Sequence, residues 1–296
     1  MATPAYFQQG RDTTISYPAT VDGLTTRLIE AGEGDRVLFC LHGVGSRADR
    51  FVPAMPALAD AGYRVIAMDF PGHGLAAKPA DFGYRARDFA GFVAGVLDSL
   101  GLRDVTLLGT SLGGQVAATL ACDRPDLVAE LVMIGTMGVV AMNEADLVAP
   151  ERVSDGSSEA VRAKLTFLVS SPTQVVDAWV REESQINSSA GAKVALHKSA
   201  EALNEDSVAD LQTDRLHDVR PTIPILLVWG EKDQWTPLSM AYRCHEALPN
   251  AELRVMNACG HAPYFENPAQ FAQIVDEFLS AQRGRKDLHS AAEGDA

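Results

Sequence analysis

The chain has 296 residues, 47% hydrophobic and 22% charged, which is typical of a globular protein that can bury a large core. Its net charge of −14 disfavours binding to nucleic acids or anionic membrane surfaces, both of which require clustered Lys and Arg. Residues 1–10 lack the basic start and apolar block of a secretory signal, and no apolar run is long enough to span a bilayer. We therefore expect a cytoplasmic protein.

The first part of the chain alternates between apolar runs typical of buried strands and amphipathic stretches typical of helices. Strands are predicted at 24–30, as an edge strand, and at 37–41, 64–69 and 105–108. Helices are predicted at 51–61, 89–100 and 112–121. This alternation favours a doubly wound, mostly parallel central sheet flanked by helices, an α/β fold.

The pattern changes after the strand predicted at 131–134. Residues 138–219 show no clear strand but several helical segments, which predicts an inserted helical cap. Strands at 224–230 and 252–256 and helices at 237–248 and 268–279 then resume the sheet. We assign residues 1–137 and 220–283 to the α/β core, 138–219 to the cap and 284–296 to a disordered tail, because that end is polar and small.

A G-x-S-x-G motif, Gly109 to Gly113, lies where a buried strand meets a helical pattern. A serine in such a sharp turn needs neighbours with almost no side chain two positions before and after it. Gly109 and Gly113 meet that need. Ser111 is therefore the candidate nucleophile.

Two further loops carry groups that a nucleophilic serine requires. In an open parallel sheet, the loops at the carboxyl ends of the strands gather in one crevice. Asp233 follows the next-to-last predicted strand and His261 follows the last. A serine hydroxyl becomes a good nucleophile when a histidine takes its proton and a carboxylate orients that histidine. Glu231 is the other acid in its loop, and we expect it to be a turn residue.

Together with the loop His42-Gly43-Val44 and the segment Asp69 to Gly74, these motifs resemble the α/β-hydrolase superfamily in their order along the chain. The resemblance covers nearly everything outside the cap and tail. It implies Ser111, Asp233 and His261 as a catalytic triad and the backbone N–H groups of Val44 and Leu112 as an oxyanion hole. His42 and His73 are expected to be structural.

No metal or organic cofactor is implied. The four cysteines, at positions 40, 122, 244 and 259, lack the spacing of a metal site and are expected to be free thiols. The expected partner is a small-molecule substrate, bound by a monomer or homo-oligomer. Side chains predicted to line its pocket are Trp179, Arg181, Trp235 and Tyr264.

The sequence favours hydrolysis of an ester or related acyl bond through an acyl-enzyme. Bacterial hydrolases that cleave a carbon–carbon bond of ring-fission products are the main alternative, since they are similar in length and cap. They typically carry Asn before the nucleophile, Trp after the histidine and Arg in a cap helix, where this chain has Thr110, Ala262 and Trp179. Lactone or amide hydrolysis also stays open, and a non-catalytic receptor is disfavoured by the intact triad.

Overall fold

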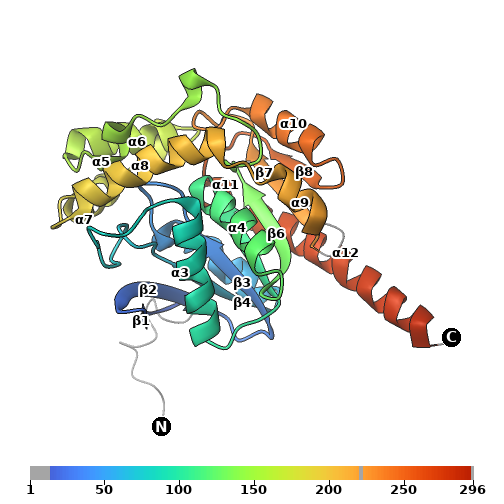
Figure 1. Ribbon diagram of the computed structural model, residues 1–296. Coiled ribbons are helices and arrows are strands. Elements are labelled where there is room, and N and C mark those ends of the chain that lie inside the picture. The colour runs from blue at the N-terminus through green and yellow to red at the C-terminus, as the bar shows by residue number, and fades with distance from the viewer. Residues whose placement is uncertain (1–13, 220–222, 295–296) are drawn as a thin grey trace, which may run out of the picture.

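A computed structural model describes residues 14–219 and 223–294 and shows one sheet with helices on both faces (Figure 1). The sheet has eight strands in the order β1-β2-β4-β3-β5-β6-β7-β8. Its β1–β2 and β2–β4 pairs are antiparallel and its other pairs are parallel. The strands are β1 (Ile15–Val21), β2 (Leu24–Ala31), β3 (Arg36–Leu41), β4 (Tyr63–Met68), β5 (Val105–Thr110), β6 (Val128–Ile134), β7 (Ile225–Gly230) and β8 (Glu252–Met256). The mostly parallel α/β fold predicted from the sequence is confirmed.

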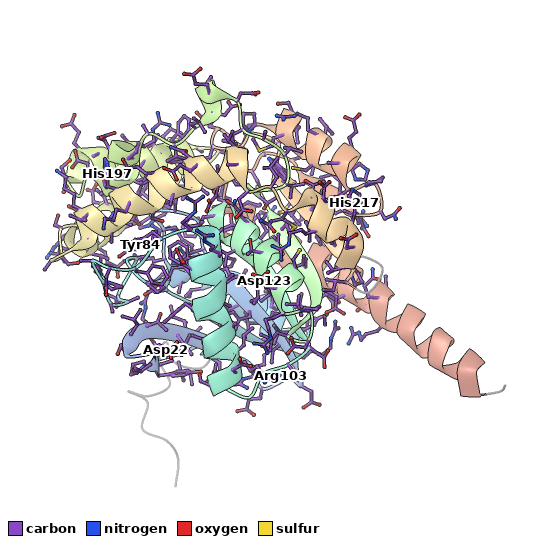
Figure 2. All side chains as sticks on the ribbon, viewed as in Figure 1. Asp22, Tyr84, Arg103, Asp123, His197 and His217 are labelled. Carbon is purple, nitrogen blue, oxygen red and sulfur yellow. The ribbon has the colours of Figure 1, made fainter. Side chains whose placement is uncertain are left out.

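The predicted edge strand is not at the edge of the sheet. It corresponds to β2, and β1 pairs outside it through a hairpin whose two turn residues are Asp22 and Gly23. Their φ angles of 50° and 78° suit a tight turn that follows the right-handed twist of the strands (Figure 2 labels Asp22). β1 was missed because most of its side chains are exposed and show no buried apolar run.

Helices cover the two faces of the sheet and form two hydrophobic cores. On one face lie α3 (Ala86–Ser99), α4 (Leu112–Asp123) and α10 (Leu238–Ala247), and on the other lie α2 (Met55–Asp60) and α12 (Pro268–Gly294). Short helices η1 (Ala48–Phe51) and α11 (Pro263–Glu266) follow β3 and β8. Because β3 to β8 run parallel to one another, the loops after their carboxyl ends meet at one edge of the sheet.

The residues between β6 and β7 that the structure describes form helices and no strand. They are η2 (Glu144–Asp146), α5 (Pro150–Ser154), α6 (Ser158–Leu168), η3 (Pro172–Gln174), α7 (Asp177–Asn187), α8 (Ala192–Ala209) and α9 (Thr213–Val219). Helices α5 to α8 lie together over one end of the sheet (Figure 1), and α6 and α7 share a small hydrophobic core. α9 instead packs on α4.

The closing helix is longer than predicted. α12 continues to Gly294, so residues 284–294 differ from the predicted disordered tail, while 295–296 lie outside the described residues, as do residues 1–10. No proline follows Pro268, and the segment is rich in Ala, Arg, Lys and Glu, which favour helix over an irregular chain. Polarity alone was therefore a poor sign of disorder.

All four cysteines are free, as predicted, and three of them are buried. Within the described ranges, no helix has the length and apolar character needed to cross a bilayer. Within the same ranges, no group of three or more His, Cys, Asp or Glu side chains is placed to hold a metal ion.

Gly113 packs so tightly that its replacement by Ala is expected to destabilise the fold. A Cβ there would lie 2.1 Å from the carbonyl oxygen of Leu41, a backbone atom with little room to move. We expect Gly113→Ala to lower the free energy of unfolding by about 3 kcal/mol or more, by the mechanism of core overpacking.

Gly91 is the matched control, because it lies within α3 and a Cβ there would meet no atom within 4 Å. Gly91→Ala should raise stability by about 0.5–1 kcal/mol, since glycine is costly inside a helix. Urea unfolding of the two variants measures both effects, and equal stabilities would refute the packing argument.

Candidate active site

Ser111 occupies a strained turn between β5 and α4. Its backbone has φ 54° and ψ −117°, far from the helix that begins at Leu112. The Ser111 N–H donates to the carbonyl of Ile134 on the neighbouring strand, at 3.0 Å, which holds the turn against the sheet. Backbone strain of this kind persists only where the surrounding structure enforces it. The turn keeps the side chain at the edge of a pocket.

Asp233 and His261 come together from the loops after β7 and β8. The His261 Nδ1–H donates to Oδ2 of Asp233 at 2.7 Å, and both side chains are more than nine-tenths buried. Asp233 also accepts from the N–H groups of Trp235 and Thr236 and from the Thr236 hydroxyl, at 2.8–2.9 Å. A carboxylate held by four donors fixes the imidazole, leaving Nε2 free to accept a proton.

The hydroxyl of Ser111 lies in the same pocket as the His261 ring. Its Oγ donates to the sulfur of Met137 at 3.5 Å, a weak hydrogen bond. The sequence-predicted triad residues are therefore brought together by the fold, from three separate loops. Their catalytic roles remain predictions.

Backbone N–H groups of Val44 and Leu112 flank Ser111. Among the described residues, neither group donates to another protein atom. Val44 lines the pocket, and the neighbouring Gly43 approaches so closely that a Cβ there would lie 3.2 Å from the Cβ of Ser111. Leu112 begins α4, where the helix dipole favours negative charge. Both groups are thus available to stabilise an oxyanion.

Buried histidines hold the loop that carries Val44. His42 accepts a hydrogen bond from the Phe70 N–H on Nε2, at 3.0 Å, and contacts the Gly43 carbonyl through Nδ1, at 2.8 Å. Burial lowers the pKa of His42 and of His73 to about 3, so both rings are neutral near pH 7. A neutral, fully bonded His42 fits the structural role expected for it.

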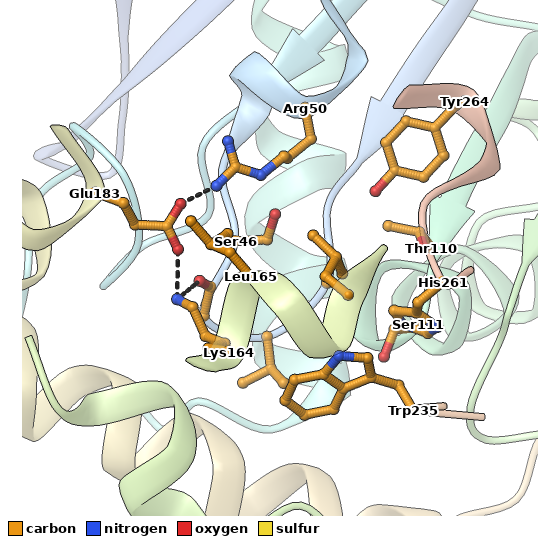
Figure 3. Close-up of a pocket in the computed structure, with 14 residues that line it drawn as sticks. Ser46, Arg50, Thr110, Ser111, Lys164, Leu165, Glu183, Trp235, His261 and Tyr264 are labelled. Carbon is orange, nitrogen blue, oxygen red and sulfur yellow. Dashed lines mark hydrogen bonds and ion pairs between the residues drawn. The ribbon is translucent and has the colours of Figure 1, made fainter. Parts of the chain in front are cut away.

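The other side of the pocket carries a buried charge cluster that the sequence analysis missed. Arg50 of η1 and Lys164 of α6 both form ion pairs with Glu183 of α7, the Lys164 Nζ lying 2.5 Å from Oε1 (Figure 3). All three residues are at least 94% buried. Burial, together with the charges of Arg50 and Arg47, lowers the pKa of Lys164 to about 7, while the Glu183 carboxylate opposes that shift.

Of the four predicted pocket residues, Trp235 and Tyr264 line the pocket and the other two do not. Trp179 lies behind it, with its ring 4.3 Å from the guanidinium carbon of Arg50. Arg181 is exposed on the outer side of α7. The reason is helical spacing, because Glu183, four positions after Trp179, shares its inward face while Arg181 does not. That spacing was the signal available in the sequence.

The sequence profile of the α/β hydrolase fold matches residues 36–268, which is most of the chain. The chain belongs to the α/β-hydrolase family. The resemblance drawn from the motifs is therefore confirmed, and with it the general activity class, a hydrolase of this fold.

Curated relatives of this α/β hydrolase include enzymes named as hydrolases of hydroxy-oxo-dienedioates and of a semialdehyde. This chain is 30% identical over 261 residues to the 2-hydroxy-6-oxononadienedioate/2-hydroxy-6-oxononatrienedioate hydrolase of Burkholderia vietnamiensis strain G4. The match covers 84% of this chain and 89% of that protein. The chain is also 30% identical over 271 residues to the 2-hydroxymuconate semialdehyde hydrolase of Pseudomonas putida, covering 87% and 92%.

Solved structures of other hydrolases superpose on most of the chain. A bacterial membrane phospholipase A matches with a TM-score of 0.80 at 25% identity, covering 94% of this chain and 90% of that one. The meta-cleavage product hydrolase of Pseudomonas fluorescens IP01 matches with a TM-score of 0.79 at 23% identity, covering 90% and 98%. The second likeness is evidence for the fold alone.

Proposed function

We propose that this α/β hydrolase uses Ser111 to cleave the carbon–carbon bond beside a ketone in a small, carboxylate-bearing dioxo acid. The observation that carries the proposal is the buried Arg50–Glu183–Lys164 cluster in the same pocket as Ser111 and His261 (Figure 3). The names of the two relatives, which specify an oxo-dienedioate and a semialdehyde of a hydroxy acid, support this substrate class. It replaces the ester as our first choice of substrate.

Charge in the cluster favours an anionic ligand. Two buried basic side chains share one buried carboxylate, and the Nε–H of Arg50 donates to no group in the described structure. Buried charges are costly unless they are paired, so a second carboxylate has a favourable place here. An Arg–carboxylate pair would also orient the substrate. The opposite side of the pocket then receives the reacting ketone.

The proposed reaction adds one water across the carbon–carbon bond. His261 Nε2 takes the Ser111 proton as Oγ attacks the ketone carbon, and the Val44 and Leu112 N–H groups stabilise the oxyanion. A 2-hydroxy substrate reacts as its 2-oxo tautomer, in which a proton has moved to the carbon beside the reacting ketone. When the oxyanion collapses, the adjacent carbon–carbon bond breaks, its electron pair is delocalised onto the 2-oxo group, and His261 returns its proton to the resulting enolate. A water, deprotonated by His261, then releases the acyl group from Ser111 as a carboxylic acid.

An ester of a carboxylate-bearing acid is the second candidate. Thr110 and Ala262 favour it, because carbon–carbon hydrolases typically carry Asn and Trp at these positions. The acyl-enzyme and the oxyanion hole would be the same. Only the leaving group would differ.

Turnover of a substrate series tests the choice. We expect kcat/KM for 2-hydroxy-6-oxononadienedioate or 2-hydroxymuconate semialdehyde to exceed that for p-nitrophenyl acetate by on the order of 10³, since a site built for a polar group discriminates against substrates lacking it. Loss of the conjugated enolate absorbance measures the reaction. Turnover of carboxylate-bearing esters without any cleavage of the dioxo acids would instead select the ester.

A further inference from the structure

We infer that Lys164 is a positioning residue that holds the oxyanion loop in place from the cap. The loop is defined here as residues 43–50, which include Val44 and Arg50. The inference rests on the proposed serine-nucleophile reaction but not on the identity of the substrate. It assigns Lys164 a second task besides its place in the charge cluster.

The contact that carries the inference joins Lys164 to the residue after Val44. Lys164 Nζ donates to the carbonyl oxygen of Gly45 at 2.8 Å, and the bond is buried. The bonded carbonyl belongs to the Gly45–Ser46 peptide unit, and a single peptide unit separates it from the Gly43–Val44 unit that presents the Val44 N–H. Fixing the Gly45 carbonyl therefore restricts the orientations open to the Val44 N–H. Oxyanion stabilisation depends on such donors being fixed before the charge develops.

A second cap helix presses on the same residue. Gly45 has φ +65°, and a Cβ there would lie 2.7 Å from the Cβ of Val153 in α5. Only glycine fits both that backbone conformation and that spacing. Gly45 therefore packs against α5 and accepts a hydrogen bond from α6. These two cap helices fix the conformation of the loop at this residue.

The far end of the oxyanion loop is also tied to the cap. Arg47 and Arg50 form ion pairs with Glu182 and Glu183 of α7, the Arg47–Glu182 distance being 2.5 Å. The core holds the loop through Asp69, whose carboxylate accepts a hydrogen bond from the Ala48 N–H at 2.8 Å. Glu182 is exposed, but Arg50 and Glu183 are both buried, and a buried ion pair is strongly destabilising to break. The loop therefore depends on α6 and α7 for contacts that the core does not replace.

Helix α6 also contacts the loop of the proposed base. The His261 N–H donates to the carbonyl of Leu168 at 2.9 Å, one helical turn after Lys164. One cap helix thus spans from the oxyanion loop to His261, with Leu165 between them lining the pocket (Figure 3). A shift of α6 would displace both the oxyanion loop and the loop that carries His261.

A neutral ester separates positioning from carboxylate binding. If Lys164 only bound a substrate carboxylate, Lys164→Met would raise KM for anionic substrates and leave p-nitrophenyl acetate unaffected. If it positions the oxyanion loop, Lys164→Met should lower kcat for p-nitrophenyl acetate by about 10–100-fold, because small displacements of catalytic groups have effects of this size. An unchanged kcat for this neutral ester would overturn the inference.

Arg162→Met is the matched control, since Arg162 lies on the same helix in an exposed ion pair with Asp177. It should change kcat less than about twofold. If Lys164→Met fails to fold, the same measurements on Lys164→Gln test the inference. The glutamine side chain is too short to reach the carbonyl of Gly45.

Hydrogen–deuterium exchange supplies a readout that does not need activity. The amides of Ser46, Ala48 and Arg50 are hydrogen bonded within or beneath the oxyanion loop. They should exchange faster in Lys164→Met than in wild type or Arg162→Met. Unchanged exchange would overturn the inference even in a protein with no esterase activity, whereas failure of the proposed function alone would leave faster exchange and no labelling of Ser111.

Discussion

Replacing Ser111 by Ala is expected to lower kcat by on the order of 10⁶ while the protein stays folded. Ser111 is the hydroxyl that the strained turn holds in the pocket beside His261, and removing Oγ removes the acyl-enzyme route. The side chain makes only one weak hydrogen bond, to Met137, so little stability is lost with it. Turnover, with circular dichroism to check folding, measures the effect.

Thr110→Val is the control for this substitution, because Thr110 lies next to Ser111 and also lines the pocket. Its side chain is buried and interacts with the Tyr264 hydroxyl, so its loss should spare reaction of Ser111 with a fluorophosphonate. Labelling should occur at Ser111 in Thr110→Val and be absent in Ser111→Ala. Residual turnover within tenfold of wild type in Ser111→Ala would show that another group is the nucleophile.

The parts of the site that depend on short stretches of sequence could be predicted. Ser111 directly follows β5, and Asp233 and His261 lie three and five residues after the ends of β7 and β8. Parallel strands bring the loops that follow them to one edge. Topology alone then placed the three residues in one crevice. The strained turn at Ser111 could be predicted from the local sequence alone, because the turn itself requires glycines such as Gly109 and Gly113 on either side of the serine.

The charge cluster could not be predicted in the same way. Arg50, Lys164 and Glu183 come from η1, α6 and α7, and their meeting depends on how the helices between β6 and β7 pack against the loop after β3. Neither the hydrophobic periodicity of the sequence nor the spacing of these three residues along the chain determines that packing. The error at Arg181 has a related cause, since two positions along a helix turn a side chain to the opposite face.

The structure near the two ends of the chain was predicted incorrectly for a different reason. Residues of β1 are paired with β2 although most of them face solvent, so the strand lacks the apolar pattern that marked the others. At the other end, charged and small residues in α12 were interpreted as disorder although they favour helix. In both cases, the sequence lacks a continuous apolar run although the backbone is regular.

Asp233→Asn is expected to lower kcat by about 10⁴ at neutral pH with little change in substrate binding. Each carboxylate oxygen of Asp233 now accepts two hydrogen bonds, and Oδ2 receives the His261 Nδ1–H. An amide nitrogen cannot accept, so one pair of these donors would lose its acceptor. With the amide donating to Nδ1, the imidazole would carry its proton on Nε2 and could not take the Ser111 proton. The pH dependence of kcat, measured on folded protein, tests this.

Glu231→Gln is the matched comparison, because Glu231 is the other carboxylate in the same loop. Its side chain is exposed and accepts a hydrogen bond from the Ala258 N–H at 3.1 Å, whereas Asp233 accepts from the imidazole of His261. An exposed carboxylate is screened by solvent and contributes little to a distant group, so the loss in kcat should stay below about tenfold. If Glu231→Gln lost more activity than Asp233→Asn, the acid of the triad would have to be reassigned, and the 2.7 Å contact between Asp233 and His261 would be structural.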